Sequence, residues 1–542
     1  MIAKEIAWTI GCFDASGGRG LAADIKTMMG LGVHGAGVAT AVCAGNTLSS
    51  SVAETVSVAA LRGQLYSLAD DLHPAAVKIG YVDNLAQVDA LVEFIEQHKP
   101  VFLVYDPDFS RLEGESSFRG QTGQAAVEGE TAALPPLLRG IKERLLPLCH
   151  LLTLDLQDAL TLLGLTAEAC PAGDDRGLLD AFIEELGLKL VALGPKSVLL
   201  KGGDRKGSFS QDYFTNGLTG LWLTSLKRTS QSTLGTGDTL SSAITAGVAL
   251  GHGILDGLII AKSYLNQTLD QAPHIGRGNG PTGHGNWTCD QSTLPWLTLS
   301  GEEGRHRLSF RPANNMGFYP IVDSFAMVET MVNAGVKHIQ LRIKELSGEA
   351  LSEEIRESAR LCRQAGAELF VNDYADLAIK HGAHGVHLGQ ADLVMQDLSR
   401  VAEAGLKLGV TALSYWEVAR ALALKPSYIT VGPIFFDDAP EREAHQGLSA
   451  LLRWRKVLDF PLVAAGGIVL ANAQSVLATG VDSIAVYRDL SGQADLTLRL
   501  EKWLRLFERK GMPSGIDRSF DASVKETGSE PPRIAHDSGL KI

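Results

Sequence analysis

The residues with the clearest chemical potential form a glycine-containing turn with the letters LGTGDTL, from Leu234 to Leu240. An apolar helix is expected to follow this turn, and the free backbone amides at the start of a helix bind anions. Asp238 would face the bound group, where a carboxylate can accept the proton of a hydroxyl during phosphoryl transfer to an alcohol. A turn with an aspartate N-cap is the structural alternative. We interpret the turn as a phosphoryl-transfer site in which Asp238 is the catalytic base.

Two other segments of the same half carry residue types that bind phosphate. The stretch from Asp14 to Asp24 is rich in glycine and leads into an expected helix that contains Lys26, although a glycine-rich loop alone is weak evidence. Lys201 stands at the end of an expected strand and precedes two glycines. That position suits a phosphate contact, and it equally suits a lysine that is solvated at a strand end.

The second half places polar side chains after successive strand-like runs. Gln340, Arg342 and Lys344 alternate along one run, so they point to the same side and can grip an oligophosphate. Asp373 and Asp392 follow the next two runs, and carboxylates on neighbouring strand ends suit a magnesium ion that bridges phosphate oxygens. A solvated strand end and a helix N-cap at Asp373 are the alternatives.

These side chains need elements that bring strand ends together. From Met1 to about Trp287, β-rich runs alternate with helical patterns, which predicts a mostly parallel sheet covered by helices. From Met316 onward, eight strand-like runs are separated by amphipathic segments, which predicts a closed (βα)8 TIM barrel with its active site at the C-terminal ends of the strands. The expected fold class is therefore α/β, with a doubly wound sheet domain followed by a barrel.

The length of 542 residues exceeds what one hydrophobic core usually supports. We expect one domain over residues 1–287, a linker of little periodicity over 288–315 and the barrel over 316–508. Residues 509–542 lose apolar content and are expected to be a disordered tail. The glycine-rich segment from Arg111 to Pro136 is expected to be a surface loop or flap.

Composition limits the partners. A hydrophobic fraction of 45% and 58 glycines are typical of a globular chain with many tight turns, and a formal charge of -13 argues against attraction to nucleic acid or anionic membranes. The six cysteines form no CxxC pair, so we expect neither disulfides nor zinc, and a reducing compartment. The chain shows neither a signal-peptide pattern nor a membrane-spanning run, so we expect a cytoplasmic protein.

The barrel half resembles thiamine-phosphate synthases. The resemblance rests on QLRIK from Gln340 to Lys344, the block from Val371 to Leu393, GPIF from Gly432 to Phe435 and AAGGI from Ala464 to Ile468. That family joins hydroxymethylpyrimidine diphosphate to a thiazole phosphate and releases pyrophosphate. The resemblance implies that magnesium is held by Asp373 and Asp392, and that the diphosphate is bound by Gln340, Arg342, Lys344 and Asn372.

Two glycines and a hydroxyl complete the expected barrel site. Gly466 and Gly467 follow the seventh strand-like run, where barrels commonly bind phosphate through backbone amides, and would hold the thiazole phosphate. A simple tight turn is the alternative for both. The segment Thr411-Ala412-Leu413 stands where the family tends to have serine, threonine and histidine, so Thr411 keeps a hydroxyl and remains a substrate-binding candidate.

Two strand ends depart from the family pattern. The loop from Phe436 to Arg442 is acidic, where the family has a threonine-rich loop with a lysine. Added carboxylates weaken the binding of a diphosphate, unless Arg442 or a second metal ion compensates. The last strand ends in Tyr487-Arg488 instead of small residues, and Arg488 could meet a phosphate.

The first half resembles the ribokinase-type hydroxymethylpyrimidine and phosphomethylpyrimidine kinases. The resemblance rests on both glycine-containing segments, on VLLKGGD from Val198 to Asp204 and on AKSYLNQTL from Ala261 to Leu269. It implies that Asp24 contacts the pyrimidine. It also implies that the phosphates of ATP are served by Lys201, Thr236, Gly237 and Thr239.

The expected substrate pocket of this half is altered. Asp238 replaces the cysteine that members usually carry in the GTG motif, which retains base chemistry. Gly45 stands in place of a pyrimidine-binding glutamine, Tyr81 in place of a methionine, and Asp108 in place of an apolar residue. Losing a bidentate amide removes substrate specificity. The block from Thr153 to Asp158 keeps acidic side chains for magnesium.

Together these resemblances imply a bifunctional enzyme of thiamine biosynthesis. The first half would phosphorylate hydroxymethylpyrimidine and its phosphate with ATP, and the barrel would consume the diphosphate; both steps would use Mg2+. A first half that acts on another vitamer of the pyridoxal type, or that only binds, is the alternative, and a non-catalytic metabolite sensor ranks last. The expected partners are small pyrimidine and thiazole phosphates, with a homo-oligomer as the assembly.

Overall fold

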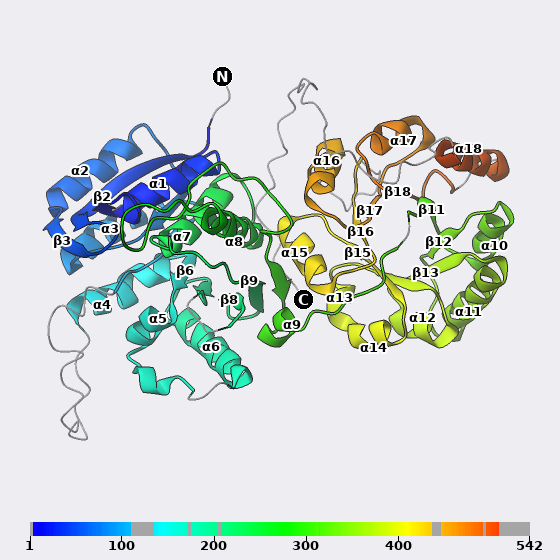
Figure 1. Cartoon of the computed structure of the whole chain (residues 1–542), viewed down its shortest axis with the longest axis horizontal. Coiled ribbons are helices and arrows are strands. Elements are labelled where there is room, and N and C mark those ends of the chain that lie inside the picture. The colour runs from blue at the N-terminus through cyan, green and yellow to red at the C-terminus, as the bar shows by residue number, and fades with distance from the viewer. Residues whose placement is uncertain are drawn as a thin grey trace. The chain divides into compact units, whose positions relative to one another are not determined.

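The computed structural model describes residues 4–109, 135–171, 175–203, 207–313, 315–435, 446–491 and 495–508. The chain divides into two compact units, Met1–His306 and Arg307–Ile542 (Figure 1). Both units combine helices with strands, so the α/β class predicted for each half is confirmed.

A ten-stranded sheet runs through the first unit in the order β10-β9-β8-β7-β6-β5-β4-β1-β2-β3. Its middle strands pair in parallel, and β3, β8, β9 and β10 are antiparallel to their neighbours. The strands are β1 (Ile6–Asp14), β2 (His34–Gly45), β3 (Ser50–Thr55), β4 (Ala76–Ile79), β5 (Leu103–Tyr105), β6 (Leu151–Leu154), β7 (Val198–Leu200), β8 (Phe209–Thr215), β9 (Gly220–Leu226) and β10 (Trp296–Thr298).

Helices cover both faces of this sheet, because alternate side chains of a strand point to opposite faces. On β1, Trp8 and Ile10 join the large apolar core, whereas Thr9 between them bonds Asp24 of α1 on the other face. The helices are α1 (Gly20–Gly30), α2 (Val58–Ala69), α3 (Leu85–His98), α4 (Pro136–Gly140), α5 (Leu156–Leu163), α6 (Arg176–Val191), α7 (Thr236–Ala249), α8 (Ile254–Asp270) and α9 (Gly301–Arg305).

Local capping residues explain several of these helix boundaries. Ser57 accepts a hydrogen bond from the Ala60 amide at the start of α2, and Asn84 accepts one from Gln87 at the start of α3. Side-chain oxygens at the N-cap satisfy amides that have no partner inside the helix. The helix α5 ends at Gly164, whose φ of 69° is a conformation that glycine adopts at low cost.

The segment 288–315, expected to be a linker, is largely part of the first unit. Strand β10 pairs with β9, and the indole of Trp296 donates to the Gly304 carbonyl. Arg305 of α9 forms an ion pair of 2.8 Å with Asp180. The first unit therefore extends to His306. No sign of β10 and α9 is visible in the sequence, because a three-residue strand and a short helix are too brief to show a periodic pattern.

The second unit is a closed barrel of eight strands, all parallel, in which β18 pairs with β11, so the predicted TIM barrel is confirmed (Figure 1). Its strands are β11 (Gly317–Val322), β12 (His338–Leu341), β13 (Glu368–Asn372), β14 (Gly385–Leu388), β15 (Lys407–Thr411), β16 (Tyr428–Val431), β17 (Leu462–Ala464) and β18 (Ser483–Val486). Its helices are α10 (Phe325–Asn333), α11 (Gly348–Ala365), α12 (Ala375–His381), α13 (Asp392–Met395), α14 (Leu398–Glu403), α15 (Tyr415–Leu424), α16 (Gly447–Val457), α17 (Leu470–Leu477) and α18 (Leu496–Glu508).

Three predicted segments fall wholly or mostly outside the described residues. They are the flap from Arg111 to Pro136, of which only the last two residues are described, the acidic loop from Phe436 to Arg442, and the tail 509–542. The predictions made for these segments stay predictions. Among the described helices, none is long and apolar enough to cross a membrane.

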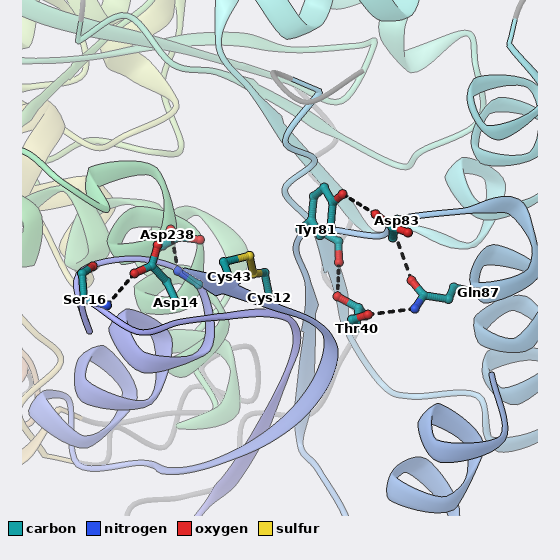
Figure 2. The surroundings of a disulfide bond; sticks show 10 residues. Cys12, Asp14, Ser16, Thr40, Cys43, Tyr81, Asp83, Gln87 and Asp238 are labelled. Carbon is teal, nitrogen blue, oxygen red and sulfur yellow. Dashed lines mark hydrogen bonds between the residues drawn. A yellow bond between two sulfur atoms is a disulfide. The ribbon is translucent and has the colours of Figure 1, made fainter. Parts of the chain in front are cut away.

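The structure joins Cys12 and Cys43 in a disulfide, with their Cα atoms 6.6 Å apart (Figure 2). The expectation of no disulfide is therefore wrong for this pair. Cys12 lies on β1 opposite Ala41 of β2, only two residues from Cys43. Parallel pairing of the two strands brings the thiols together, although 31 residues separate them in the sequence. The remaining cysteines are free thiols: Cys149, Cys170, Cys289 and Cys362.

Candidate active sites

The turn that carries Asp238 forms the start of α7, as the sequence predicts. Thr236 is the first residue of the helix, and Gly235 before it has a φ of 79°. A Cβ atom on Gly235 would lie 2.0 Å from the Gly18 carbonyl oxygen. A glycine is therefore required there, both by its conformation and by the glycine-rich loop that packs against it. The two glycine segments, more than 200 residues apart in the sequence, form one site.

A buried lysine holds the carboxylate of Asp238. Lys78 of β4 places its ammonium 3.1 Å from Asp238 Oδ1 and 2.6 Å from Asp24 Oδ1. The Gly20 amide donates to Asp238 Oδ2 at 2.9 Å (Figure 2). Burial alone would lower the pKa of Lys78, but Asp24 and Asp238 raise it more, so the net direction is upward and the ammonium keeps its proton.

The sequence analysis missed Lys78, although a signal existed. Lys78 is fully buried within the apolar run AVKIG. A charged side chain inside an otherwise apolar strand is almost never fully buried unless it has a partner, and the run therefore pointed to buried carboxylates nearby.

Lys201 reaches the same helix start from the end of β7. Its ammonium lies 2.8 Å from Asp106 Oδ1, and a Cβ on Gly237 would be 3.3 Å from its Nζ atom. The hydroxyls of Thr153 and Ser241 also donate to the Asp106 carboxylate, both at 2.7 Å. Burial would raise the pKa of Asp106, but Lys201 and Lys78 lower it more, and the net direction is downward.

An acidic group lies beside Lys201. Asp155 caps the start of α5 by accepting from the Asp158 amide at 2.7 Å. Burial raises the pKa of Asp158 to about 8; Asp155 and Asp108 also raise it, and Lys201 lowers it. Carboxylates that raise one another's pKa favour a cation among them, so these residues fit the metal ion that accompanies a nucleotide.

Two predicted ligands of the first unit do not face an open site. Asp24 is 2% exposed, and its carboxylate is bonded by Lys78 and by the Thr9 hydroxyl at 2.5 Å. Thr239 is fully buried and shares a hydrogen bond of 3.3 Å with Thr282. Because Thr239 lies one residue after Asp238 on α7, its side chain points in a different direction and is buried against Thr282.

The surroundings of Gly45 explain why that position has no side chain. A Cβ atom there would lie 2.7 Å from Asp14 Oδ2. The Asp14 carboxylate is fixed by the Ser16 amide at 2.7 Å (Figure 2). Tyr81 packs on the other side against the Cys12–Cys43 disulfide, and its hydroxyl donates to Asp83 at 2.6 Å. An aspartate and a disulfide thus occupy the region where a pyrimidine-binding glutamine was expected.

The predicted diphosphate residues of the barrel gather at the C-terminal ends of β12 and β13. Gln340 is buried on β12, Arg342 and Lys344 follow that strand, and Asn372 ends β13. Lys344 forms an ion pair with Asp373. The role predicted for these residues in binding a diphosphate stays a prediction.

The two predicted metal ligands lie together. Asp373 has a φ of 69°, a left-handed conformation that costs energy for a residue with a side chain and is concentrated at functional sites. Burial raises the pKa of Asp392, and the neighbouring Asp373 carboxylate raises it further. The described residues contain no cluster of three or more metal-ligating side chains, so a bound ion would take its other ligands from substrate or water.

A hydrogen-bonded chain runs beneath this site and ends at Thr411. His387 Nε2 shares a hydrogen bond of 2.9 Å with Thr411, and Nδ1 shares one of 3.0 Å with Tyr428. Tyr428 in turn bonds Tyr319 at 2.9 Å. Burial lowers the pKa of His387 to about 4, so the ring is neutral. Sequence analysis singled out Thr411 but missed the histidine and tyrosines that orient its hydroxyl.

Gly466 and Gly467 follow β17 with φ angles of 87° and 65°. A Cβ on Gly466 would lie 2.5 Å from Pro433, and one on Gly467 would lie 2.8 Å from Phe435. Both glycines are therefore required by the close approach of the segment that follows β16 and precedes the acidic loop. Arg488, a further phosphate candidate, is exposed after β18.

The fold and the two candidate sites define a two-part phosphate-handling transferase: an α/β kinase, followed by a TIM barrel with basic and acidic side chains at the ends of its strands. Residues 14–283 match the family described as phosphomethylpyrimidine kinase, and residues 318–490 match the family described as thiamine monophosphate synthase. The thiamine-phosphate synthase of Klebsiella pneumoniae is 45% identical over 193 residues, which are 35% of this chain and 92% of that enzyme. The chain belongs to the thiamine-phosphate synthase family and carries a phosphomethylpyrimidine kinase domain before its synthase barrel.

Further relatives match one part of the chain or the other. The thiamine-phosphate synthase of Photorhabdus laumondii is 43% identical over 202 residues, 37% of this chain and 94% of that enzyme. A phosphomethylpyrimidine kinase structure from Clostridium difficile is 26% identical, with a TM-score of 0.36, and covers 48% of this chain and 99% of its own. A Bacillus subtilis pyridoxal kinase in complex with ADP is 24% identical, with a TM-score of 0.43, and covers 52% and 98%. The two activities of this chain serve thiamine biosynthesis.

Proposed function

We propose that Asp238 is the base of the kinase domain, which phosphorylates hydroxymethylpyrimidine and its phosphate with ATP. The observation that carries this proposal is the position of the Asp238 carboxylate, one-quarter exposed in the first turn of α7. The free amides of that turn bind the transferring phosphoryl group, and Asp238 accepts the proton of the attacking hydroxyl. Lys201, Thr236 and Gly237 hold the nucleotide phosphates.

Magnesium fits the acidic group of this domain. Asp155 and Asp158 would hold it, since burial raises the pKa of Asp158, the Asp155 carboxylate raises it further, and a cation would relieve both effects. When bound, the ion neutralises charge on the nucleotide phosphates. Lys201, which contacts Asp106 at 2.8 Å, also lowers the pKa of Asp158 and so supplies positive charge near this group.

The test measures ATP consumption by the full chain with hydroxymethylpyrimidine, with its phosphate and with pyridoxal. Asp238→Asn is expected to reduce kcat at least about 1000-fold, because the proton acceptor is lost, while pyrophosphate release by the barrel is unchanged. Retention of kinase activity in this variant would overturn the assignment of the base.

A pyridoxal-type vitamer is a second candidate substrate. It is favoured by the arrangement at Gly45, where the Asp14 carboxylate fills the place of a side-chain amide. Loss of that amide removes two directed hydrogen bonds to a pyrimidine edge. A kcat/KM for pyridoxal above that for both pyrimidines would establish this candidate, and turnover of both pyrimidines with no turnover of pyridoxal would exclude it.

In the barrel we propose that Gln340, Arg342, Lys344 and Asn372 bind the diphosphate of the pyrimidine. Cleavage of the bond between the pyrimidine CH2 group and oxygen leaves a benzylic-type cation, so the site mainly stabilises the departing pyrophosphate and positions the thiazole nitrogen. Thr411 is held toward the substrate by His387. The backbone at Gly466 and Gly467 holds the thiazole phosphate.

Magnesium also fits the barrel site. Asp373 and Asp392 would hold it, because the pKa of Asp392 is raised by burial and by Asp373, and a cation relieves both effects. Bound there, the ion would neutralise charge on the leaving pyrophosphate.

With Asp392→Asn, the Mg2+ concentration for half-maximal pyrophosphate release is expected to rise at least about 10-fold, with kinase activity as the control. An unchanged Mg2+ requirement would exclude Asp392 as a ligand.

A further inference from the structure

Lys78 makes no contact with solvent, and its ammonium contacts the carboxylates of Asp238 and Asp24. Its side chain is fully buried on β4. The ammonium contacts Asp238 twice, at Oδ1 (3.1 Å) and at the backbone carbonyl (3.5 Å), and it contacts Asp24 at 2.6 Å. A substrate cannot reach it. Any effect of Lys78 on the reaction must therefore pass through the groups beside it, and of the two carboxylates that it contacts only Asp238 is partly exposed.

These contacts fix the plane of the Asp238 carboxylate. Lys78 holds Oδ1 from beneath, and the Gly20 amide holds Oδ2 at 2.9 Å. Each carboxylate oxygen has a further lone pair that can accept a proton, and the side chain is one-quarter exposed. A proton acceptor held in one orientation avoids reorganisation at the moment of reaction, and misplacement by about 1 Å costs on the order of 100-fold in rate.

Asp24 completes the charge balance of the cluster. It accepts from Lys78 and from the Thr9 hydroxyl, so both of its oxygens are engaged. With Asp24 and Asp238 ionised and Lys78 protonated, the cluster carries one net negative charge. When Asp238 accepts a proton, Asp24 and Lys78 remain as a complete ion pair, and no buried charge is left without a partner.

We propose that Lys78 and Asp24 are positioning residues for the kinase reaction: they orient Asp238 and set the charge against which it accepts a proton. The proposal rests on Asp238 being the base, as proposed above. Without Asp24, the ammonium would neutralise Asp238 and weaken it as an acceptor. Without Lys78, two carboxylates would face each other with no cation between them.

Other charged groups face the cluster from the surrounding elements. They are Asp106 after β5, Lys201 after β7 and His284 after α8. These groups stay in place in all the variants proposed below, so the changes expected there arise from the substituted residue.

The test records kcat and KM against pH for ATP-dependent phosphorylation by the full chain. Lys78→Met removes the positive charge, so the acidic limb of the kcat profile is expected to move up by about one pH unit, with kcat lower by about 100-fold and both KM values within about 3-fold. Asp24→Asn leaves the lysine charge uncompensated, so the acidic limb is expected to move down by about one pH unit. Lys78→Arg is expected to restore part of kcat.

Shifts in opposite directions distinguish this proposal from a structural role, because a loss of folding lowers activity without moving the limb. Arg305→Met is the matched control, since Arg305 forms an ion pair of 2.8 Å with Asp180 and shares no contact with the site; its acidic limb should equal that of the unsubstituted chain. Pyrophosphate release by the barrel reports on the integrity of each preparation. If Lys78→Met does not fold, the proposal is tested by Asp24→Asn alone: a downward shift of its acidic limb supports the positioning role, and an unchanged limb overturns it.

Two results separate this proposal from the one on which it rests. Unchanged acidic limbs in Lys78→Met and Asp24→Asn, with an inactive Asp238→Asn, would overturn the positioning role and leave Asp238 as the base. An active Asp238→Asn would overturn the assignment of the base, and the positioning role with it.

Discussion

Single residues at the kinase site are held in conformations that only the packed structure explains. Gly235 combines a φ of 79° with a Cβ position only 2.0 Å from the Gly18 carbonyl. Either feature alone disfavours a side chain; together they make the glycine necessary for the contact between the two glycine segments. Asp14 and Gly45 form a similar pair, in which the carboxylate takes the space of the missing side chain.

Gly235→Ala is therefore expected to be severely destabilising. The methyl group would push the glycine-rich loop away from α7, and we expect a loss of roughly 3 kcal/mol of unfolding free energy together with loss of kinase activity. Gly251→Ala is the matched control: its φ is 86°, and a Cβ there meets nothing within 4 Å, so only the backbone term of about 1 kcal/mol applies. Equal losses in a denaturant titration of both variants would contradict the argument.

Among the elements, β1 and β2 carry the disulfide close to the loop that connects β1 to α1. Cys12 and Cys43 are 8% and 1% exposed. The end of β1 leads into the loop that holds Gly20 against Asp238, and the end of β2 pairs with β1 beside that loop. The disulfide therefore limits how far these strand ends can separate.

Cys12→Ser with Cys43→Ser is expected to lower the free energy of unfolding of the first unit by about 2 kcal/mol, since the bond closes a loop between residues 31 apart. A reductant should lower the stability of the unsubstituted chain by the same amount and leave the double variant unchanged. Cys170→Ser, at a free thiol, serves as the control. Thermal unfolding that does not respond to reductant would show that the bond contributes nothing.

The segment after α8 packs His284 between two threonines. Its ring nitrogens each lie 3.2 Å from a hydroxyl, of Thr27 and of Thr282. Burial lowers the pKa of His284 to about 4, and Lys26 adds to the effect. The unfolded chain binds the proton near pH 6.5 and the folded chain only near pH 4, so stability is lost as pH falls through this window.

His284→Gln keeps hydrogen-bonding atoms but cannot acquire charge. When the pH falls from 6.5 to 4, the free energy of unfolding of the first unit is expected to decrease in both proteins. The decrease should be larger by about 2 kcal/mol in the unsubstituted chain than in this variant. The measurement is urea unfolding at a series of pH values. Parallel pH curves for the two proteins would exclude His284 as the source of acid sensitivity.

At the scale of the whole molecule, the chain contains two units with separate hydrophobic cores. A ligand that binds only the folded form of one unit stabilises that unit, by about 2.7 kcal/mol at 100 times its Kd. We expect ADP with Mg2+ to raise the temperature of one unfolding transition, and pyrophosphate with Mg2+ to raise that of the other. A single transition that both ligands shift equally would contradict this expectation.

The sequence allowed much of this architecture to be predicted, because its signals are local. The alternation of strands and helices gave the parallel sheet and the barrel, and strand periodicity placed Gln340, Arg342 and Lys344 together. Short elements were not predicted from the sequence: β10 and α9 lie inside the segment 288–315, which was expected to be a linker. A strand of three residues has too few side chains to show a period.

By itself the sequence determined the presence of two domains and their fold classes, and it supplied the candidate residues for phosphate chemistry, since these depend on periodicity and on motifs of neighbouring residues. Only the tertiary structure decided how those residues are used. It turned Asp24 and Thr239 inward, brought Lys78 under Asp238, joined Cys12 to Cys43 and placed His387 behind Thr411. Each of these contacts joins segments from 24 to 160 residues apart, and such pairings are set by strand order and helix packing, which no local pattern encodes.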